Sequence, residues 1–195
     1  MRQSSIYWQN KSMEKQQRDF RAAADIVTAA LMTFPEIAAI GLTGSTAKPL
    51  WKEVPRFREF KRAGIKVWHE CGDVDLAVWL DARDHLGEMR LAKDRALRQS
   101  YEAGTSSGVA NHQIDIFLFD PGSDRYLGRL CWFNACPKGK PECRVPGCGD
   151  VAFNRIHEDF YPDANLLTAA RENMLYERGK GVLMSALDLP PPPSG

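Results

Sequence analysis

The N-terminal part of the chain changes from a helical to a strand-like pattern of apolar positions. From Met13 to Phe34, apolar residues recur every three or four positions, which is typical of one face of an amphipathic helix. Pro35 predicts the end of that helix, because proline lacks the N–H that a helix interior requires. The run from Ile37 to Leu42 then predicts a short strand, and residues 1–12 predict a polar arm.

Two later segments alternate aspartates with apolar residues. Val74 to Leu80 places apolar side chains at every second position, so Asp73 and Asp75 fall on the opposite face of the strand. The segment from Ile114 to Leu118 has the same alternation around Asp115. If the two strands are neighbours in one sheet, the three carboxylates converge on a small patch.

A predicted helix separates these two strands. Asp81-Ala82-Arg83-Asp84 places acidic residues in a first helical turn, where they interact favourably with the helix dipole. We expect this helix to continue to about Tyr101 and a last helix to run from Pro162 towards Arg178. In the helix that separates the two strands, the residues expected to face the sheet are Leu86, Met89, Leu97 and Tyr101. Strand, helix and strand in this order predict an α/β fold.

The segment from Ala47 to Cys71 is basic and aromatic. Its cationic residues are Lys48, Lys52, Arg56, Arg58, Lys61, Arg62 and Lys66, and its aromatic residues are Trp51, Phe57, Phe60 and Trp68. Cations beside aromatic rings can bind a triphosphate, stack a base or follow an RNA backbone, which makes Arg58 and Lys61 candidate substrate-binding residues. The alternative is a helix from Glu53 to Ala63 and a strand from Ile65 to Trp68, with solvated charges and packed rings.

Four of the five cysteines are close together in the sequence. Cys131, Cys136, Cys143 and Cys148 form a C-x4-C-x6-C-x4-C array among prolines and glycines. Such residues favour tight turns that let thiolates converge, and four thiolates suit tetrahedral Zn²⁺. We expect a structural zinc site here, with His157 as a candidate replacement for one cysteine. Free or redox-active thiols are the alternative.

The pattern divides the chain into four parts. We expect a core at 13–125 that includes the basic insertion at 47–71, and a Cys-rich zinc segment at 126–160. A helical segment at 161–188 follows. The proline-rich residues 189–195 predict a disordered tail.

Composition adds constraints on location and partners. The 195 residues contain 26 Lys plus Arg and 25 Asp plus Glu, which give a net charge of +1. The chain therefore has no global bias towards nucleic acid or anionic membranes, and any such binding must be local. The first 20 residues are charged and have no apolar core, which predicts that there is no secretory signal. No apolar run is long enough for a membrane span, so we expect a cytoplasmic protein.

Three converging carboxylates require a positive partner. At about 4 Å and an effective dielectric near 20, each pair of like charges costs about 4 kcal/mol, so three pairs approach about 12 kcal/mol. Hard oxygen ligands suit Mg²⁺ or Mn²⁺. Two such ions about 3.5 to 4 Å apart are a known device for in-line phosphoryl displacement. Asp73, Asp75 and Asp115 are therefore candidate metal ligands.

Gly44 and Ser45 complete a recognisable order of motifs. Gly44 lets the backbone approach a phosphate, and Ser45 offers it a hydroxyl and an N–H. The chain carries Gly44-Ser45, then Asp73-Val74-Asp75, and then a strand with Asp115. This order of motifs resembles that of the DNA polymerase beta superfamily of nucleotidyltransferases. The resemblance covers residues 38 to 119. The spacer of 27 residues between Ser45 and Asp73 is longer than in compact members of that superfamily.

The resemblance implies a fold, a reaction and roles for individual residues. The fold would be a small mixed sheet flanked by helices, with the Cys-rich loop segment attached. The reaction would move a nucleoside monophosphate from an NTP to a hydroxyl, with Mg²⁺ or Mn²⁺ as cofactor and pyrophosphate as the leaving group. Gly44 and Ser45 would hold the β and γ phosphates. Asp73 and Asp75 would bind both metals, and Asp115 would complete the second metal site.

The acceptor is left open by these motifs. The chain is short for a processive polymerase, so we expect a small molecule or a protein to be the acceptor. A tRNA or another RNA is the alternative enzyme substrate, which the basic insertion favours. A non-catalytic module that binds a nucleotide or a partner is the alternative outside the enzymes.

Overall fold

A computed structural model describes residues 3–50, 58–65, 67–68, 71–105, 108–130 and 164–190. The cysteines of the predicted zinc segment lie outside these residues, as does His157. Residues 51–57, 66, 69 and 70 of the basic insertion and the last five residues also lie outside them. The predicted zinc site therefore stays a prediction.

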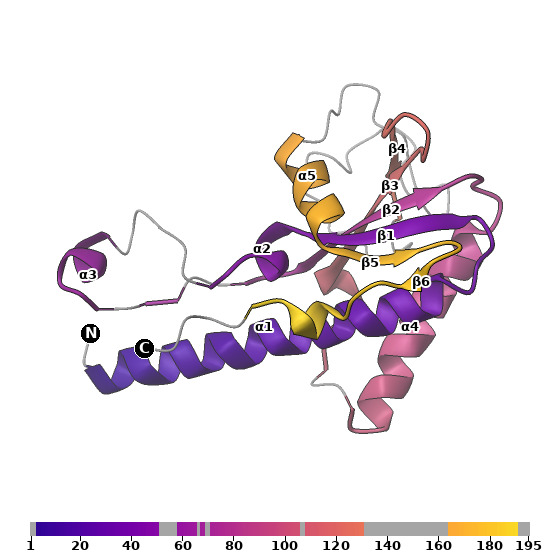
Figure 1. The fold of residues 1–195 in the computed structure, drawn as a ribbon. Helices are drawn as coiled ribbons and strands as arrows, with labels where there is room; N and C mark the ends of the chain where they lie inside the picture. Colours follow the sequence, from indigo (N-terminus) through magenta and orange to yellow (C-terminus); the bar gives the residue numbers. More distant parts are fainter. Residues whose placement is uncertain are drawn as a thin grey trace, which may run out of the picture.

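The described chain forms a six-stranded mixed sheet (Figure 1). The strand order is β4-β3-β2-β1-β5-β6. The strands are β1 (Ile37–Thr43), β2 (Val74–Leu80), β3 (Ile114–Phe119), β4 (Tyr126–Arg129), β5 (Met174–Glu177) and β6 (Gly181–Val182). Strands β2 and β3 are parallel, and the other neighbours are antiparallel. The predicted α/β class with a mixed sheet flanked by helices is confirmed.

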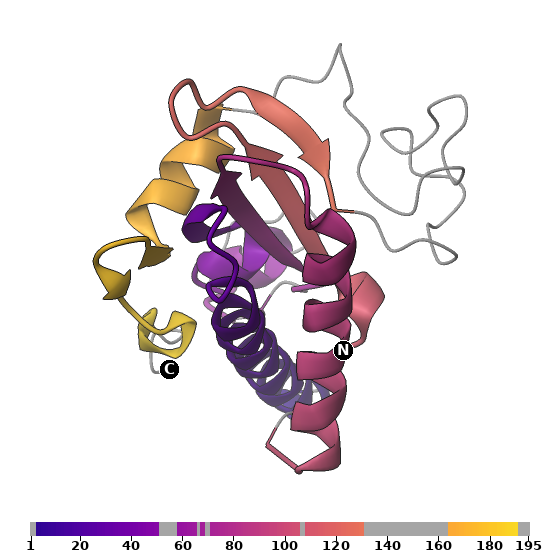
Figure 2. The same cartoon turned by 90° about the vertical axis from the view of Figure 1, so that its right-hand side faces the viewer.

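Two long helices cover one face of the sheet. Helices α1 (Gln3–Leu31) and α4 (Leu86–Glu102) lie side by side beneath it (Figure 2). The main core joins their apolar faces to the alternate residues of the central strands. Its members include Phe20, Val27, Leu31, Leu76, Val78, Leu86, Met89, Ile114, Ile116 and Leu118. None of the helices in the described part of the chain is long and apolar enough to cross a membrane.

The short helix α5 (Ala164–Glu172) packs on the opposite face. A smaller apolar cluster of Ala77, Trp79, Phe119 and Ala170 fills this interface. Helix α5 approaches β1 closely, because a Cβ atom added at Gly41 would lie 2.2 Å from the carbonyl oxygen of Ala170. A side chain at Gly41 is therefore incompatible with this packing.

Several predicted element boundaries are wrong. Helix α1 begins at Gln3, because Gln3, Gln9 and Lys11 of the supposed arm are good helix formers and Ile6 extends the buried stripe. Helix α4 begins at Leu86 and not near Asp81, whose backbone N–H still donates to the Glu36 carbonyl beside the sheet. Tyr101, predicted to face the sheet, is 65% exposed.

The basic insertion and the C-terminal part also differ from the prediction. In the insertion, α3 covers Arg58–Arg62, and the described residues between Ile65 and Trp68 form no strand. The last helix ends at Glu172, and β5 follows it, because Met174 and Leu175 pack on opposite faces of the sheet. Strand β5 fills the edge beside β1.

The last described residues, up to position 190, pack more closely than a disordered tail would. Leu189, which the proline-rich composition placed in the tail, is buried against the main core. The preceding 3-10 helix η4 (Ala186–Asp188) is held on α1 by Asp25. That carboxylate accepts hydrogen bonds from the Ser185 hydroxyl and the Ala186 N–H.

We predict that Gly41→Ala destabilises the protein. The added methyl group meets the Ala170 carbonyl and forces α5 away from β1, which should cost about 1–3 kcal/mol of unfolding free energy. Urea unfolding measures the change. Gly72→Ala is the matched control, because a Cβ at Gly72 meets no atom within 4 Å. Equal stability of the two variants would contradict the close packing of α5.

Candidate metal centre

The candidate site lies where three neighbouring strands are aligned in register. Thr43 at the end of β1 pairs with Asp75 at the start of β2. Asp75 in turn pairs with Asp115 at the start of β3. Directly paired residues on neighbouring strands point to the same face of a sheet. The register therefore places the turn after Thr43 beside Asp75, with Asp115 on the next strand, on the face covered by α5.

The three predicted carboxylates lie together. Asp73, Asp75 and Asp115 each place one carboxylate oxygen within 4.8 Å of the others. Asp73 and Asp75 are half-buried, and Asp115 is buried. The predicted convergence of these residues is confirmed. The donor set consists of hard oxygen atoms at short spacing, and this chemistry fits Mg²⁺ or Mn²⁺.

Gly44 brings the backbone against Asp75. Gly44 begins the short helix α2 (Gly44–Ala47) with a φ of +72°, a conformation that favours glycine. A Cβ atom added here would lie 2.0 Å from Oδ2 of Asp75. No larger residue fits between this turn and the carboxylate. Ser45, the next residue, is half-buried beside the acidic cluster.

Thr46 ties the Gly44-Ser45 turn to the acidic strand. Its buried hydroxyl donates to the Asp73 carbonyl oxygen at 2.6 Å and lies 3.1 Å from Sγ of Cys71. Ser45 Oγ lies 3.5 Å from the same sulfur. Burial raises the pKa of the Cys71 thiol above its usual range. Cys71 therefore acts as a neutral packing partner between the turn and Asp73.

Helix α1 braces both sides of this turn with polar side chains. Gln16 donates to the Cys71 carbonyl at 2.7 Å, and Gln17 donates to the Lys48 carbonyl at 2.7 Å. Arg21, which is buried, donates from Nε to the Thr46 carbonyl at 3.2 Å. Its Nη1 also donates to the carbonyls of Leu189 and Pro190. The helix thus satisfies backbone oxygens around the site that would otherwise be buried without a partner.

Arg129 provides a charged partner for Asp115. Its Nη2 lies 3.0 Å from Oδ1 of Asp115, and both side chains are buried. The register of β3 with β4 pairs Arg129 with Phe117, two residues beyond Asp115 and on the same face. Arg129 was not predicted as a site residue, because β4 lies in the range assigned to the Cys-rich segment.

Lys93 supplies a second buried cation from the helix side of the sheet. It is only 2% exposed, and Nζ donates to the carbonyls of Asn111 and Ile114 at 3.2 and 3.4 Å. Burial lowers the pKa of Lys93 to about 8, while Asp94 and Asp115 oppose that shift. Its position in α4 was not a distinctive signal in the sequence, since lysines on helices are usually solvated.

The candidate substrate-binding residues lie on α3. Arg58 is exposed at the start of this helix, and Lys61 belongs to the same helix. Figure 1 shows α3 standing apart from the strands that carry the aspartates. The structure does not bring Arg58 into the acidic cluster, and a role for these residues in substrate binding stays a prediction.

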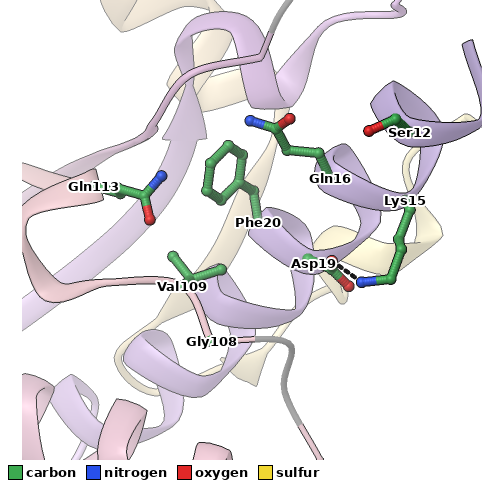
Figure 3. Close-up of a pocket in the computed structure, with 8 residues that line it drawn as sticks. All are labelled: Ser12, Lys15, Gln16, Asp19, Phe20, Gly108, Val109 and Gln113. Carbon is green, nitrogen blue, oxygen red and sulfur yellow. Dashed lines mark hydrogen bonds and ion pairs between the residues drawn. The ribbon is translucent and has the colours of Figure 1, made fainter. Parts of the chain in front are cut away.

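An open pocket of about 230 Å³ lies between α1 and the chain that leads into β3 (Figure 3). Its lining residues are Ser12, Lys15, Gln16, Asp19, Phe20, Gly108, Val109 and Gln113. Lys15 and Asp19 form an ion pair of 2.8 Å at one side of it. The pocket is on the α1 side of the sheet, whereas Asp75 and Asp115 face α5.

The geometry thus joins three carboxylates, a glycine turn and two buried cations at one end of the sheet. Comparisons of the chain with protein-family models, curated proteins and solved structures gave no match. The acidic triad is the feature with the clearest chemistry, because its oxygens suit a divalent cation.

We predict that Gly44→Ala lowers the affinity of the protein for Mn²⁺ by about tenfold or more. The new methyl group displaces the Asp75 carboxylate and the turn must also leave its positive φ, so the ligand set loses its geometry. Mn²⁺ titration followed by electron paramagnetic resonance measures the affinity. Gly122→Ala, in the exposed β3–β4 turn, should bind Mn²⁺ like the wild type. Unchanged affinity in Gly44→Ala would show that the turn does not constrain Asp75.

We predict that Lys93 makes the free energy of unfolding rise with pH between about pH 8 and pH 10.5. The folded protein releases this proton near pH 8, whereas the unfolded chain holds it until about pH 10.5. The unfolded state therefore binds more protons in this window, and its free energy relative to the folded state increases with pH. Urea unfolding of wild type and Lys93→Met across that window isolates the effect. Parallel pH profiles for the two proteins would contradict a depressed pKa at Lys93.

Proposed function

We propose that the protein is a metal-dependent nucleotidyltransferase of the polymerase beta type. It would transfer a nucleoside monophosphate from an NTP to a hydroxyl group and release pyrophosphate. The observation that carries this proposal is the position of the Gly44 turn directly against Asp75, with Asp73 and Asp115 in the same cluster. A turn open to a phosphate and a divalent-cation ligand set are the two parts that such chemistry needs.

The three aspartates are the proposed ligands of Mg²⁺ or Mn²⁺. When bound, the cations would neutralise the charge of the triphosphate and of the departing pyrophosphate. Asp73 and Asp75 are half-buried and so remain accessible to a nucleotide from solvent. Asp115 lies deeper, beside Arg129. Phosphoryl transfer depends mainly on positioning and charge neutralisation, so the site needs few other groups.

The chain's own residues would bind and orient the reactants. Gly44, which has no side chain, would let the backbone approach the β and γ phosphates, and the Ser45 hydroxyl would donate to them. The acceptor oxygen would form a bond to the α-phosphorus while the bond from that phosphorus to the pyrophosphate oxygen breaks. Asp115 would orient the acceptor hydroxyl or accept its proton. Thr46 would keep the turn in register with Asp73 through its 2.6 Å hydrogen bond.

The acceptor we propose is a small molecule or a protein. RNA, including tRNA, is the alternative acceptor, and the exposed Arg58 on α3 is the described residue that supports it. A contribution of α3 to RNA binding would show as binding that weakens steeply with salt. A non-catalytic nucleotide-binding module is the alternative outside the enzymes. Pyrophosphate release separates the enzyme from that module.

We predict that Asp75→Asn abolishes turnover while the fold persists. The amide removes a charge from the ligand set and should lower the rate on the order of 10³-fold or more. Release of pyrophosphate from each of the four NTPs with Mg²⁺ or Mn²⁺ measures turnover, with aminoglycosides, lincosamides, total tRNA or a cell extract as the acceptor source. Asp81→Asn is the matched control, because Asp81 follows the other end of β2 and pairs with Arg178.

The outcomes separate the alternatives. Release that depends on one acceptor and disappears only in Asp75→Asn supports the transferase and identifies the acceptor class. Normal turnover by Asp75→Asn would disprove the site. No release by folded wild-type protein under any of these conditions would favour the binding module.

A further inference from the structure

Arg129 already occupies the charged position beside Asp115. The pair is 3.0 Å long and buried, and it joins neighbouring strands β3 and β4 on one face of the sheet. Breaking one side of a buried ion pair leaves the other charge desolvated and uncompensated. The guanidinium of Arg129 is therefore held against the carboxylate as part of the fold, and Asp115 differs in this respect from an aspartate at a solvated rim.

Lys93 reinforces the positive field around Asp115. Its ammonium donates to the carbonyl of Ile114, the residue directly before Asp115, and its interaction with the Asp115 charge is attractive. Asp115 thus has one cation on each face of the sheet. A divalent cation bound to Asp115 would be repelled by both, and each repulsion is twice that between unit charges at the same distance. Asp73 and Asp75 lie nearer to solvent, where such repulsion is better screened.

We propose that Arg129 is a positioning residue that sets how many metal ions the free site binds. In the nucleotide-free protein it holds Asp115 in an ion pair, so the site binds one divalent cation, mainly through Asp73 and Asp75. A second cation enters together with the triphosphate, whose negative charge offsets the added positive charge. This inference rests on the proposed function and adds the order in which the two cations arrive.

Mn²⁺ titration of the nucleotide-free, full-length chain tests this order. Electron paramagnetic resonance of the free Mn²⁺ gives stoichiometry and affinity together. Wild type should bind one Mn²⁺, and Asp115→Asn should change that affinity by less than about threefold. Arg129→Gln should bind a second Mn²⁺, or bind the first about tenfold more tightly. Arg125→Gln, an exposed arginine of the same hairpin, should behave like the wild type.

Stability measurements separate this role from simple packing. Arg129→Gln removes the guanidinium beside Asp115 and leaves Lys93 on the other face of the sheet, so the variant's loss of stability in urea should be largely restored by Mn²⁺. A residue that only packs would lose the same stability with or without the metal. The double variant Arg129→Gln with Asp115→Asn removes both charges, and we expect it to fold and to bind one Mn²⁺. This variant keeps the test decisive if Arg129→Gln alone folds poorly.

Two results would overturn the inference without touching the proposed function. One is binding of two Mn²⁺ ions by wild type, with Asp115→Asn removing one of them. The other is an Arg129→Gln protein whose stoichiometry and affinity equal those of the wild type. Failure of the proposed function has a different signature. It would show as an Asp75→Asn variant that binds Mn²⁺ as tightly as the wild type, or as no Mn²⁺ binding at all.

Discussion

The mutual repulsion of three carboxylates is the constraint on which the site end of the sheet depends. Their oxygens lie within 4.8 Å of one another, and at that separation each like-charged pair costs about 3.5 kcal/mol at an effective dielectric near 20. The fold offsets this cost from both faces of the sheet, through Arg129 on β4 and Lys93 on α4. Both cations themselves lose hydration on burial. The arrangement balances desolvated charges of both signs, and Asp73 and Asp75 are its half-buried members.

Much of this arrangement was predictable, because the central strands follow simple rules. Because side chains alternate along a strand, Asp75 and Asp115 lie on one face of the sheet and Leu76 and Ile116 on the other. A helix between β2 and β3 allows these two strands to lie parallel. Gly44 was predictable as a close-approach position, since its lack of a side chain is itself the signal. The amphipathic period of α1 identified the helix that covers the core, although its polar first turns were predicted to be a non-helical arm.

The residues that support the site were not predictable from their types. Arg129, Lys93 and Thr46 are common residues, and each matters only because the tertiary structure places it near Asp115 or Asp73. Strands β4 and β5 were missed for a related reason. Each has four residues, which is too short for a clear alternation, and each exists because a neighbouring strand offers an edge to pair with. Local pattern thus identifies central elements better than edge elements.

The contacts of Arg21 relate the site to the order in which the chain is made. This residue of α1 supports the Thr46 carbonyl, but it also donates to the carbonyl of Leu189, which lies 168 residues further along the chain. A growing chain folds from its N-terminus as it is synthesised. All three aspartates and the glycine turn are therefore made well before Arg21 has its full set of acceptors. The turn against Asp75 gains its complete support only when the residues around Leu189 have been made.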